Sequence, residues 1–258
     1  IIISESGIYN NEQVRELAPA VDGFLVGSSL MAMDNNAYND IDLACRKLIY
    51  GNNKVCGLTA PEYATAAANA GARFVGLIFA EKSPRCISKE QALTIINTQP
   101  QLEYVGVFVN HKRTDIVDLV KSLSLTAVQL HGDEDNAYID ALKAQLNDND
   151  CGQCMIWKAY ALTDNVPKLN TNVDNHVLDG KSPGSGQAFD WQMLTDSKQD
   201  LSNSLLAGGL NSENINFALA QLTDLDLFGL DLNSGVETSP GIKCSEKLNQ
   251  VFTQIRNY

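Results

Sequence analysis

Residues 104–130 hold one full copy of the pattern that decides the fold: Tyr104-Val-Gly-Val-Phe-Val109, then Thr114-Asp-Ile-Val-Asp-Leu-Val-Lys-Ser-Leu123, then Ala127-Val-Gln-Leu130. The first and last stretches are apolar on both faces, which is typical of strands covered on both sides. The middle stretch carries apolar residues at helical spacing from Ile116 to Leu123. The segment therefore predicts a β-α-β unit with parallel strands.

The same alternation continues from residue 53 to the end of the chain. Eight apolar runs predict strands, at 54–56, 74–79, 104–109, 127–130, 155–159, 176–178, 204–207 and 227–232. Further helices are predicted at 64–70, which ends at Gly71, and at 211–222, which begins with the cap-like Asn-Ser-Glu. Eight such units predict an α/β protein with a (β/α)8 TIM barrel. An open doubly wound sheet would call for G-x-G-x-x-G after the first strand, and Cys56-Gly-Leu-Thr59 does not match that motif.

A repeat links the two ends of the chain. Residues 6–29 and 208–235 both read as strand end, helix, strand and Gly/Ser turn, the pattern that closes a barrel and commonly builds its phosphate site. We therefore predict two domains: residues 1–50 as the last quarter of a second, truncated TIM barrel, and residues 53–258 as a complete one. The alternative is chance similarity of two β-α-β pieces. Because a quarter barrel leaves sheet edges uncovered, we expect residues 1–50 to be less stable or to pack outside the complete barrel.

Composition excludes several classes of protein. The chain has 258 residues, 44% apolar and 19% charged, which excludes disorder, collagen and coiled coils. Apolar runs are far shorter than the ~20 residues of a membrane helix. A net charge of −12 argues against nucleic acid or anionic lipid as partners, yet backbone N–H groups can still hold a small anion. No signal peptide is visible, and a start at Ile1 rather than Met suggests a fragment or a processed piece.

The cysteines indicate the compartment. Six of them are spread through a chain large enough to bury a core, which predicts reduced thiols and a cytoplasmic protein rather than a disulfide framework. Cys151-Gly-Gln-Cys154 is a lone CxxC with no second pair and no nearby histidine. A loop is therefore the favoured interpretation over a zinc or redox site.

The strand ends predict the active site, because a barrel of this kind works at the carboxyl face of its strands. Strand one ends at Cys56, strand six at Asp179, and strands seven and eight at Gly208-Gly209 and Asn233-Ser234-Gly235. In a closed ring, strands seven and eight lie between six and one. A phosphate held there by glycine N–H groups and the Ser234 hydroxyl would have Asp179 on one flank and Cys56 on the other. This order predicts an acid/base pair beside a bound phosphosugar.

Each candidate also has a purely structural interpretation. Cys56 could be a core residue, Asp179 a helix cap and Gly208-Gly209 a turn. To act as a base, the Cys56 thiol needs positive charge nearby, because free cysteine titrates near ~8.5. To act as an acid, Asp179 must keep a proton, which burial favours.

Three further features flank these strand ends. Arg85, after strand two, could pair with a substrate carboxylate or be a solvated loop residue. His131, after strand four, could contact substrate or pack in the core. The Gly/Ser-rich loop 180–186 follows Asp179 and is predicted to be a mobile lid.

The motifs together carry a family resemblance. They are Lys54-Val-Cys-Gly-Leu-Thr59, Ser83-Pro-Arg-Cys86, Tyr104-Val-Gly-Val-Phe-Val109, Gln129-Leu-His-Gly132, Val177-Leu-Asp179, Gly184-Ser-Gly-Gln187 with Phe189-Asp-Trp191, Ala207-Gly-Gly-Leu210 and Asn233-Ser-Gly-Val-Glu237. In this order they resemble phosphoribosylanthranilate isomerase over residues 53–258. Residues 1–50, through Ser4-Glu-Ser-Gly-Ile8 and Gly23-Phe-Leu-Val-Gly-Ser28, resemble the end of indole-3-glycerol-phosphate synthase. The whole chain is similar to the fused bifunctional enzyme of tryptophan biosynthesis.

The resemblance implies the Amadori rearrangement of N-(5'-phosphoribosyl)anthranilate to 1-(2-carboxyphenylamino)-1-deoxy-D-ribulose 5-phosphate. It implies that Asp179 protonates the ribose ring oxygen and opens the ring to a Schiff base, that Cys56 removes the C2' proton, and that Arg85 contacts the anthranilate carboxylate. It implies a monomeric chain with no metal and no organic cofactor.

The synthase portion is expected to be inactive. By the resemblance, Glu5 and Ser6 match late active-site residues of the synthase, and Gly27 and Ser28 match its phosphate loop. Its catalytic lysines and other acidic residues would lie upstream. We expect no decarboxylating ring closure from this chain, whereas the full-length parent would have both activities.

Two rival functions stay open. A metal-dependent epimerase on the same fold needs His and Asp ligands that converge from several strand ends, and His131 is the one well-placed histidine. A barrel that binds a phosphosugar without turnover, as a scaffold for a partner, is compatible with the same fold. Turnover by Cys56→Ala and Asp179→Asn variants discriminates between these functions.

Overall fold

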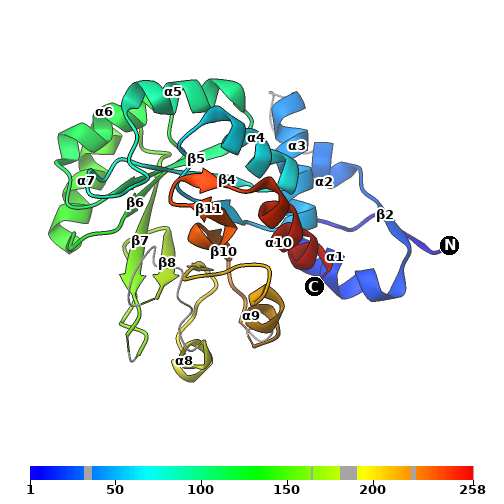
Figure 1. Ribbon diagram of the computed structural model, residues 1–258. Helices are drawn as coiled ribbons and strands as arrows, with labels where there is room; N and C mark the ends of the chain where they lie inside the picture. Colours follow the sequence, from blue (N-terminus) through cyan, green and yellow to red (C-terminus); the bar gives the residue numbers. More distant parts are fainter. Residues whose placement is uncertain (32–36, 164, 181–190, 222–224, 258) are drawn as a thin grey trace.

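Eight parallel strands close into a barrel in the computed structural model, which describes residues 1–31, 37–163, 165–180, 191–221 and 225–257 (Figure 1). Around the ring the order is β10-β3-β4-β5-β6-β7-β8-β9. The strands are β3 (Lys54–Val55), β4 (Phe74–Ile78), β5 (Glu103–Phe108), β6 (Ala127–Leu130), β7 (Met155–Ala161), β8 (Asn175–Asp179), β9 (Ser204–Leu206) and β10 (Gly229–Leu232). The predicted TIM barrel is confirmed, and each predicted strand lies within three residues of an observed one at both ends.

Helices cover the outside of the ring (Figure 1). They are α4 (Pro61–Ala70), α5 (Lys89–Thr98), α6 (Arg113–Leu123), α7 (Asn136–Asp148), α8 (Gln192–Asp196), α9 (Ile215–Gln221) and α10 (Ser245–Asn257). Local sequence explains their ends. Helix α4 starts with Pro61 in its first turn and stops at Gly71, whose φ of 115° lies in the left-handed region. Ser88 and Gln91 form a capping box on α5.

Two segments differ from the regular pattern. The helix predicted at 211–222 begins later, at Ile215, because the Asn211 side chain accepts hydrogen bonds from the N–H groups of Glu213 and Asn214 and folds this segment into a turn. Between β7 and β8, the described residues 162–163 and 165–174 form a loop instead of a helix. This loop is held by polar side chains, for example Asn172, whose N–H bonds to Asn170 at 2.8 Å.

The strands are apolar on both faces because they separate two hydrophobic cores. In β4, Phe74 and Ile78 belong to clusters inside the ring, whereas Val75 and Leu77 pack in the larger core under the helices. The inner core is built around Trp157 on β7, whose ring meets Phe74 edge-on at 5.0 Å between centroids. This packing fills the lower part of the barrel, so only its mouth is left for a ligand.

The polypeptide before the barrel forms a small unit at one side (Figure 1). It contains β1 (Ile3–Glu5), α1 (Asn11–Leu17), the 3-10 turn η1 (Ala18–Ala20), β2 (Gly23–Leu25), α2 (Ser28–Met31) and α3 (Ala37–Tyr50). Strands β1 and β2 pair in parallel, and helix α3 packs on the outside of the barrel, where Tyr50 meets Phe252 at 5.7 Å. The predicted packing outside the barrel is therefore observed for α3. The origin of residues 1–50 in a second barrel stays a prediction.

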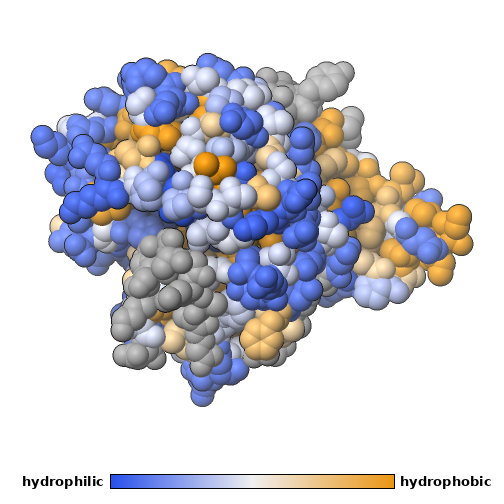
Figure 2. Space-filling model, in the orientation of Figure 1, coloured by the Kyte–Doolittle hydropathy of each residue, from blue (hydrophilic) through white to orange (hydrophobic). Residues whose placement is uncertain are grey.

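Apolar side chains gather on the surface of this N-terminal unit, at the right of Figure 2. Ile1, Ile2, Ile3, Tyr9 and Leu25 are all exposed. Throughout the described residues, no helix is long and apolar enough to cross a membrane.

We expect Phe74→Ala to lower the free energy of unfolding by about 3–5 kcal/mol, because it removes a fully buried ring from the inner core and leaves a cavity. Urea unfolding measures the change. The control is Leu93→Ala on α5, where the side chain is 37% exposed and the expected change is within about 0.5 kcal/mol. Equal effects of the two substitutions would contradict this account of the core.

Amide hydrogen exchange is expected to be faster in β1 and β2 than in β4 to β8. The N-terminal strands have three residues each and carry no buried side chain, and α1, which connects them in the sequence, buries none either. Few buried contacts permit local opening at low free energy. Equal protection in the two regions, measured by mass spectrometry, would show that the N-terminal unit is as stable as the barrel.

Candidate active site

A cavity of about 870 Å³ opens at the carboxyl ends of the barrel strands, a volume typical of small-molecule sites. Seven residues predicted from the strand ends line it: Cys56, Arg85, His131, Asp179, Gly208, Gly209 and Ser234. Lys54 lies beneath, and Asp231, Gln129 and Asn233 also reach the wall. The structure therefore places these seven residues around one cavity, whereas Gly235 is not part of the lining.

Cys56 follows β3 directly, and its N–H donates to Leu232 O at 2.8 Å, which continues the ladder with β10. Its thiol lies in a small apolar cluster with Ile78 and Val107. Gly76 makes this position possible, because a Cβ there would lie 2.6 Å from Sγ of Cys56. Burial raises the pKa of Cys56, and the positive charge of Lys54 acts in the opposite direction.

Lys54 and Asp231 form an ion pair inside the barrel. Nζ of Lys54 lies 2.8 Å from Oδ2 of Asp231, and the two residues are register partners on β3 and β10. Burial alone lowers the pKa of Lys54, but Asp231 and Cys56 outweigh burial and the pKa is raised. The other carboxylate oxygen of Asp231, Oδ1, is buried and has no hydrogen-bond partner among the described residues.

Asp179 ends β8 and is buried. Its Oδ1 accepts a hydrogen bond from the N–H of Gly180 at 2.8 Å. Burial, followed by the negative charge of Asp231, raises the pKa of Asp179 to about 6, although Gly180 and Lys54 oppose the shift. A carboxyl group in this environment keeps its proton much closer to neutral pH than a free aspartate does.

The loop after β9 presents backbone N–H groups at the cavity. Gly208 and Gly209 have φ values of 89° and 70°, which glycine adopts without strain. The side chains of Asn211 and Asn214 donate to the Gly209 carbonyl at 3.1 and 2.9 Å. Among the described residues, neither glycine N–H has an acceptor. A group of free N–H donors of this kind suits an anion.

The loop after β10 adds Ser234 to the cavity wall. It continues into the 3-10 turn η2 (Ser234–Val236). Here Gly235 has a packing role, because a Cβ would lie 2.0 Å from the Leu210 carbonyl oxygen. Gly235 thus lets the loops after β9 and β10 approach each other closely.

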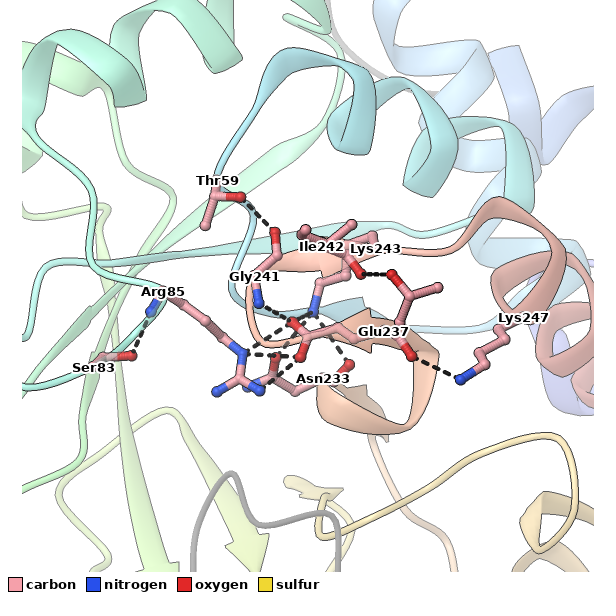
Figure 3. A network of polar contacts seen from close by, with 10 residues as sticks. Thr59, Ser83, Arg85, Asn233, Glu237, Gly241, Ile242, Lys243 and Lys247 are labelled. Carbon is pink, nitrogen blue, oxygen red and sulfur yellow. Dashed lines mark hydrogen bonds and ion pairs between the residues drawn. The ribbon is translucent and has the colours of Figure 1, made fainter.

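Arg85 is anchored by a residue that the sequence analysis did not single out for a role (Figure 3). Its Nε donates to Glu237 Oε1 at 2.9 Å, and its Nη2 donates to Oε2 at 2.6 Å. Nη1 donates no hydrogen bond within the described ranges, so this end of the guanidinium is available to a ligand. Glu237 belongs to β11 (Glu237–Ser239), which pairs with β12 (Ile242–Lys243) above the barrel mouth.

A buried lysine completes this network. Lys243 donates to Glu237 Oε1 at 2.8 Å and to Asn233 Oδ1 at 3.0 Å, and the N–H of Gly241 also reaches Glu237 (Figure 3). Burial would raise the pKa of Glu237, but Arg85 and Lys243 outweigh it and lower the pKa. One carboxylate thus holds two cationic side chains, Arg85 and Lys243, in place.

His131 reaches the cavity from the end of β6. Its Nδ1 lies 3.3 Å from Nε2 of Gln129, while its Nε2 is buried without a hydrogen-bond partner among the described residues. Burial, together with the charge of Lys54, lowers the pKa of His131. The imidazole is therefore neutral at pH 7, and its Nε2 can either donate or accept one hydrogen bond with a ligand.

Two groups of predicted residues do not join the cavity. Residues 181–186 of the predicted lid lie outside the described residues. Glu5 ends β1 and Ser6 follows it, while Gly27 and Ser28 come after the paired strand β2, and none of the four residues lines the cavity. Within the described ranges, no cluster of three His, Cys, Asp or Glu side chains has the geometry of a metal site.

The sequence analysis assigned no role to Lys54 or Asp231, although both carry a weak sequence signal. Lys54 and Asp231 are charged residues inside apolar strands that are covered on both faces. A buried charge needs a partner, so each one predicts some ion pair. Nothing local indicates that the partner lies 177 residues away.

Fold and cavity together define a (β/α)8-barrel protein with a small-molecule site at the carboxyl face of its strands. The family model described as N-(5'phosphoribosyl)anthranilate (PRA) isomerase matches residues 53–254. The chain belongs to this family.

Relatives and solved structures agree with that assignment. The chain is 48% identical to the tryptophan biosynthesis protein TrpCF of Vibrio cholerae and 46% identical to that of Salmonella typhi. Each comparison covers 100% of this chain and 52% or 54% of the relative, so the chain spans about half the length of these relatives.

Among solved structures, phosphoribosyl anthranilate isomerase from Thermus thermophilus has 31% identity and a TM-score of 0.67, over 79% of this chain and 98% of that one. A second isomerase, in complex with reduced 1-(o-carboxyphenylamino)-1-deoxyribulose 5-phosphate, has 28% identity and a TM-score of 0.62, over 81% of this chain and 100% of that one.

Asp179→Asn is expected to stabilise the protein more at high pH than at low pH. Because the folded-state pKa lies above the unfolded value, the folded protein holds this proton more tightly. In strong acid Asp179 is protonated in both states and does not lower the free energy of unfolding. As the pH rises from about 4 through about 6, the unfolded state loses this proton first, so Asp179 increasingly lowers the free energy of unfolding. Urea unfolding should show a gain about 1 kcal/mol larger at pH 8 than at pH 5. An equal gain at both pH values would contradict the raised pKa.

Proposed function

We propose that this chain is a phosphoribosylanthranilate isomerase that converts N-(5'-phosphoribosyl)anthranilate to 1-(2-carboxyphenylamino)-1-deoxy-D-ribulose 5-phosphate in tryptophan biosynthesis. Family membership and the product analogue bound by a solved relative support this substrate class. The observation that carries the proposal is one cavity whose wall holds a thiol, a carboxyl group with a raised pKa and a loop of free backbone N–H groups.

Asp179 is the general acid in this proposal. The carboxyl group donates its proton to the ribose ring oxygen, and the C1'–O bond breaks to leave a protonated Schiff base. A pKa of about 6 supports this role, because a proton donor works best when its pKa lies near the working pH.

Cys56 is the general base. It removes the proton from C2' of the Schiff base, and the resulting enolamine tautomerises to the ketone. Burial raises the pKa of the thiol and so disfavours its thiolate, but the cations around it act against burial. Lys54, Lys243 and Arg85 all interact electrostatically with Cys56.

The two ends of the substrate bind at opposite sides of this pair. Gly208, Gly209 and Ser234 hold the phosphate through backbone N–H groups and the Ser234 hydroxyl. Arg85 binds the anthranilate carboxylate with the end of its guanidinium that Glu237 does not occupy. His131 offers its buried Nε2 to the bound sugar. No metal or organic cofactor enters this scheme.

The complete protein is proposed to carry a second activity. The relatives named TrpCF are about twice as long as this chain, and the segment 1–50 is proposed to be the end of an indole-3-glycerol-phosphate synthase domain. Glu5, Ser6, Gly27 and Ser28 would then belong to that site. This chain alone is proposed to lack the synthase activity, and its monomeric state and cytoplasmic location stay predictions.

An isomerase assay that follows the loss of anthranilate-type fluorescence tests the proposal. Cys56→Ala and Asp179→Asn are each expected to lower kcat by roughly 10²–10⁴-fold, the usual contribution of one acid or base. Cys244→Ala is the matched control, because this half-buried thiol lies outside the cavity lining. Its rate is expected to equal that of the wild type.

Two outcomes would overturn the assignment. If both variants turn over substrate at the wild-type rate, the acid and base roles are wrong. If the wild type binds a reduced substrate analogue but never isomerises the substrate, the barrel is a binding scaffold.

A further inference from the structure

The ion pair between Lys54 and Asp231 has a position that its contribution to the fold does not explain. Lys54 is fully buried and Asp231 is 7% exposed, and removing two charges from water costs several kcal/mol per ion before their attraction is counted. Apolar residues of similar size often serve a core equally well. The pair nevertheless lies directly under the cavity, where Asp231 forms part of the wall.

The pair lies beside both reacting groups. Lys54 is on β3, and Cys56 follows two residues later in the same extended segment. Because alternate residues of a strand face the same side, both side chains point to the barrel interior. Asp231 is on β10, which is flanked by β3 on one side and by β9 on the other, and β9 in turn pairs with β8, the strand of Asp179. The charge pair therefore occupies β3 and β10, with Cys56 directly after β3 and one strand, β9, between Asp231 and the strand of Asp179.

One oxygen of Asp231 is uncommitted. Oδ2 bonds to Lys54, whereas Oδ1 is buried and finds no donor among the described residues. A carboxylate with one free oxygen at the wall of a cavity can present part of its negative charge to neighbouring groups. It does so without losing the ion pair.

We propose that Asp231 is a positioning residue for the isomerisation: its carboxylate holds the Lys54 ammonium group beside Cys56, and its negative charge keeps the proton on Asp179. The proposal rests on the function proposed above. In this arrangement a single buried pair prepares both groups in opposite senses. The ammonium group favours the thiolate of the base, and the carboxylate favours the protonated form of the acid.

The charges that face the two groups are consistent with this division. Cys56 faces Lys54 on its own strand, Asp231 on β10, Arg85 from the loop after β4 and Lys243 on β12. Asp179 faces Asp231 and Lys54. For both groups Asp231 raises the pKa and Lys54 lowers it. For Cys56 the effect of Lys54 is the larger, and for Asp179 that of Asp231 is the larger.

The decisive measurement is the pH dependence of Cys56 alkylation by iodoacetamide, followed by peptide mass spectrometry without substrate. Asp231→Asn keeps the shape and a hydrogen-bond acceptor for Lys54 but removes the negative charge. The midpoint of alkylation is expected to fall by about one pH unit, because the carboxylate that opposes the thiolate is gone and the Cys56 thiolate becomes the counter-charge of Lys54. In the double variant Lys54→Met/Asp231→Asn both charges are gone, and the midpoint is expected to rise above that of the wild type.

Opposite directions separate this proposal from a purely structural role, which would move both variants alike or neither. Glu134→Gln is the matched control, because it removes the carboxylate of another buried pair, with Lys158 at 2.9 Å. The Cys56 midpoint is expected to stay unchanged there. Unchanged midpoints in both Asp231 variants, or shifts in the same direction, would overturn the proposal.

Activity supplies the second test. In Asp231→Asn, both limbs of the pH profile of kcat/KM are expected to move to lower pH, since the same charge acts on both groups. Alkylation needs no turnover, so the two proposals fail separately. Alkylation shifts without any isomerase activity in the wild type would refute the function alone. Isomerase activity with unmoved alkylation midpoints would refute the role of Asp231 alone.

Discussion

The seam between β10 and β3 is the constraint on which the rest of the structure depends. Here the last strand of the ring meets the first, through the register pairs Asp231 with Lys54 and Leu232 with Val55. The N–H of Cys56 extends the seam by a hydrogen bond to Leu232. If the ring did not close at this point, Cys56 would lie at a sheet edge, far from the strands that end in Asp179 and the glycine loop.

Burial acts on the two candidate catalytic groups in the same direction, with different consequences. It raises the pKa of Asp179, which helps a proton donor, and it raises the pKa of Cys56, which hinders a base. Both groups are buried, and the charges placed next to each of them differ. Cations gather around the thiol, and a carboxylate lies near the acid.

The network of Glu237 connects the two ends of the cavity. On one side it holds the guanidinium of Arg85 by three contacts, and on the other it binds Lys243, which bonds to Asn233 beside the loop of Ser234. A substrate that carries a carboxylate at one end and a phosphate at the other would meet groups whose separation is set by this network. Bidentate pairs of this kind fix orientation as well as charge.

Local pattern was enough to place most elements of the barrel and to order its strand ends, because periodicity of apolar residues and turn signals are properties of neighbouring residues. It therefore determined that Cys56, Asp179 and the glycine loop share one face. It did not determine the pairing of Lys54 with Asp231 or of Arg85 with Glu237, residues separated by 177 and 152 positions. Only closure of the ring brings such charges within 3 Å of each other, and only the loss of water around them turns their contacts into shifts of pKa.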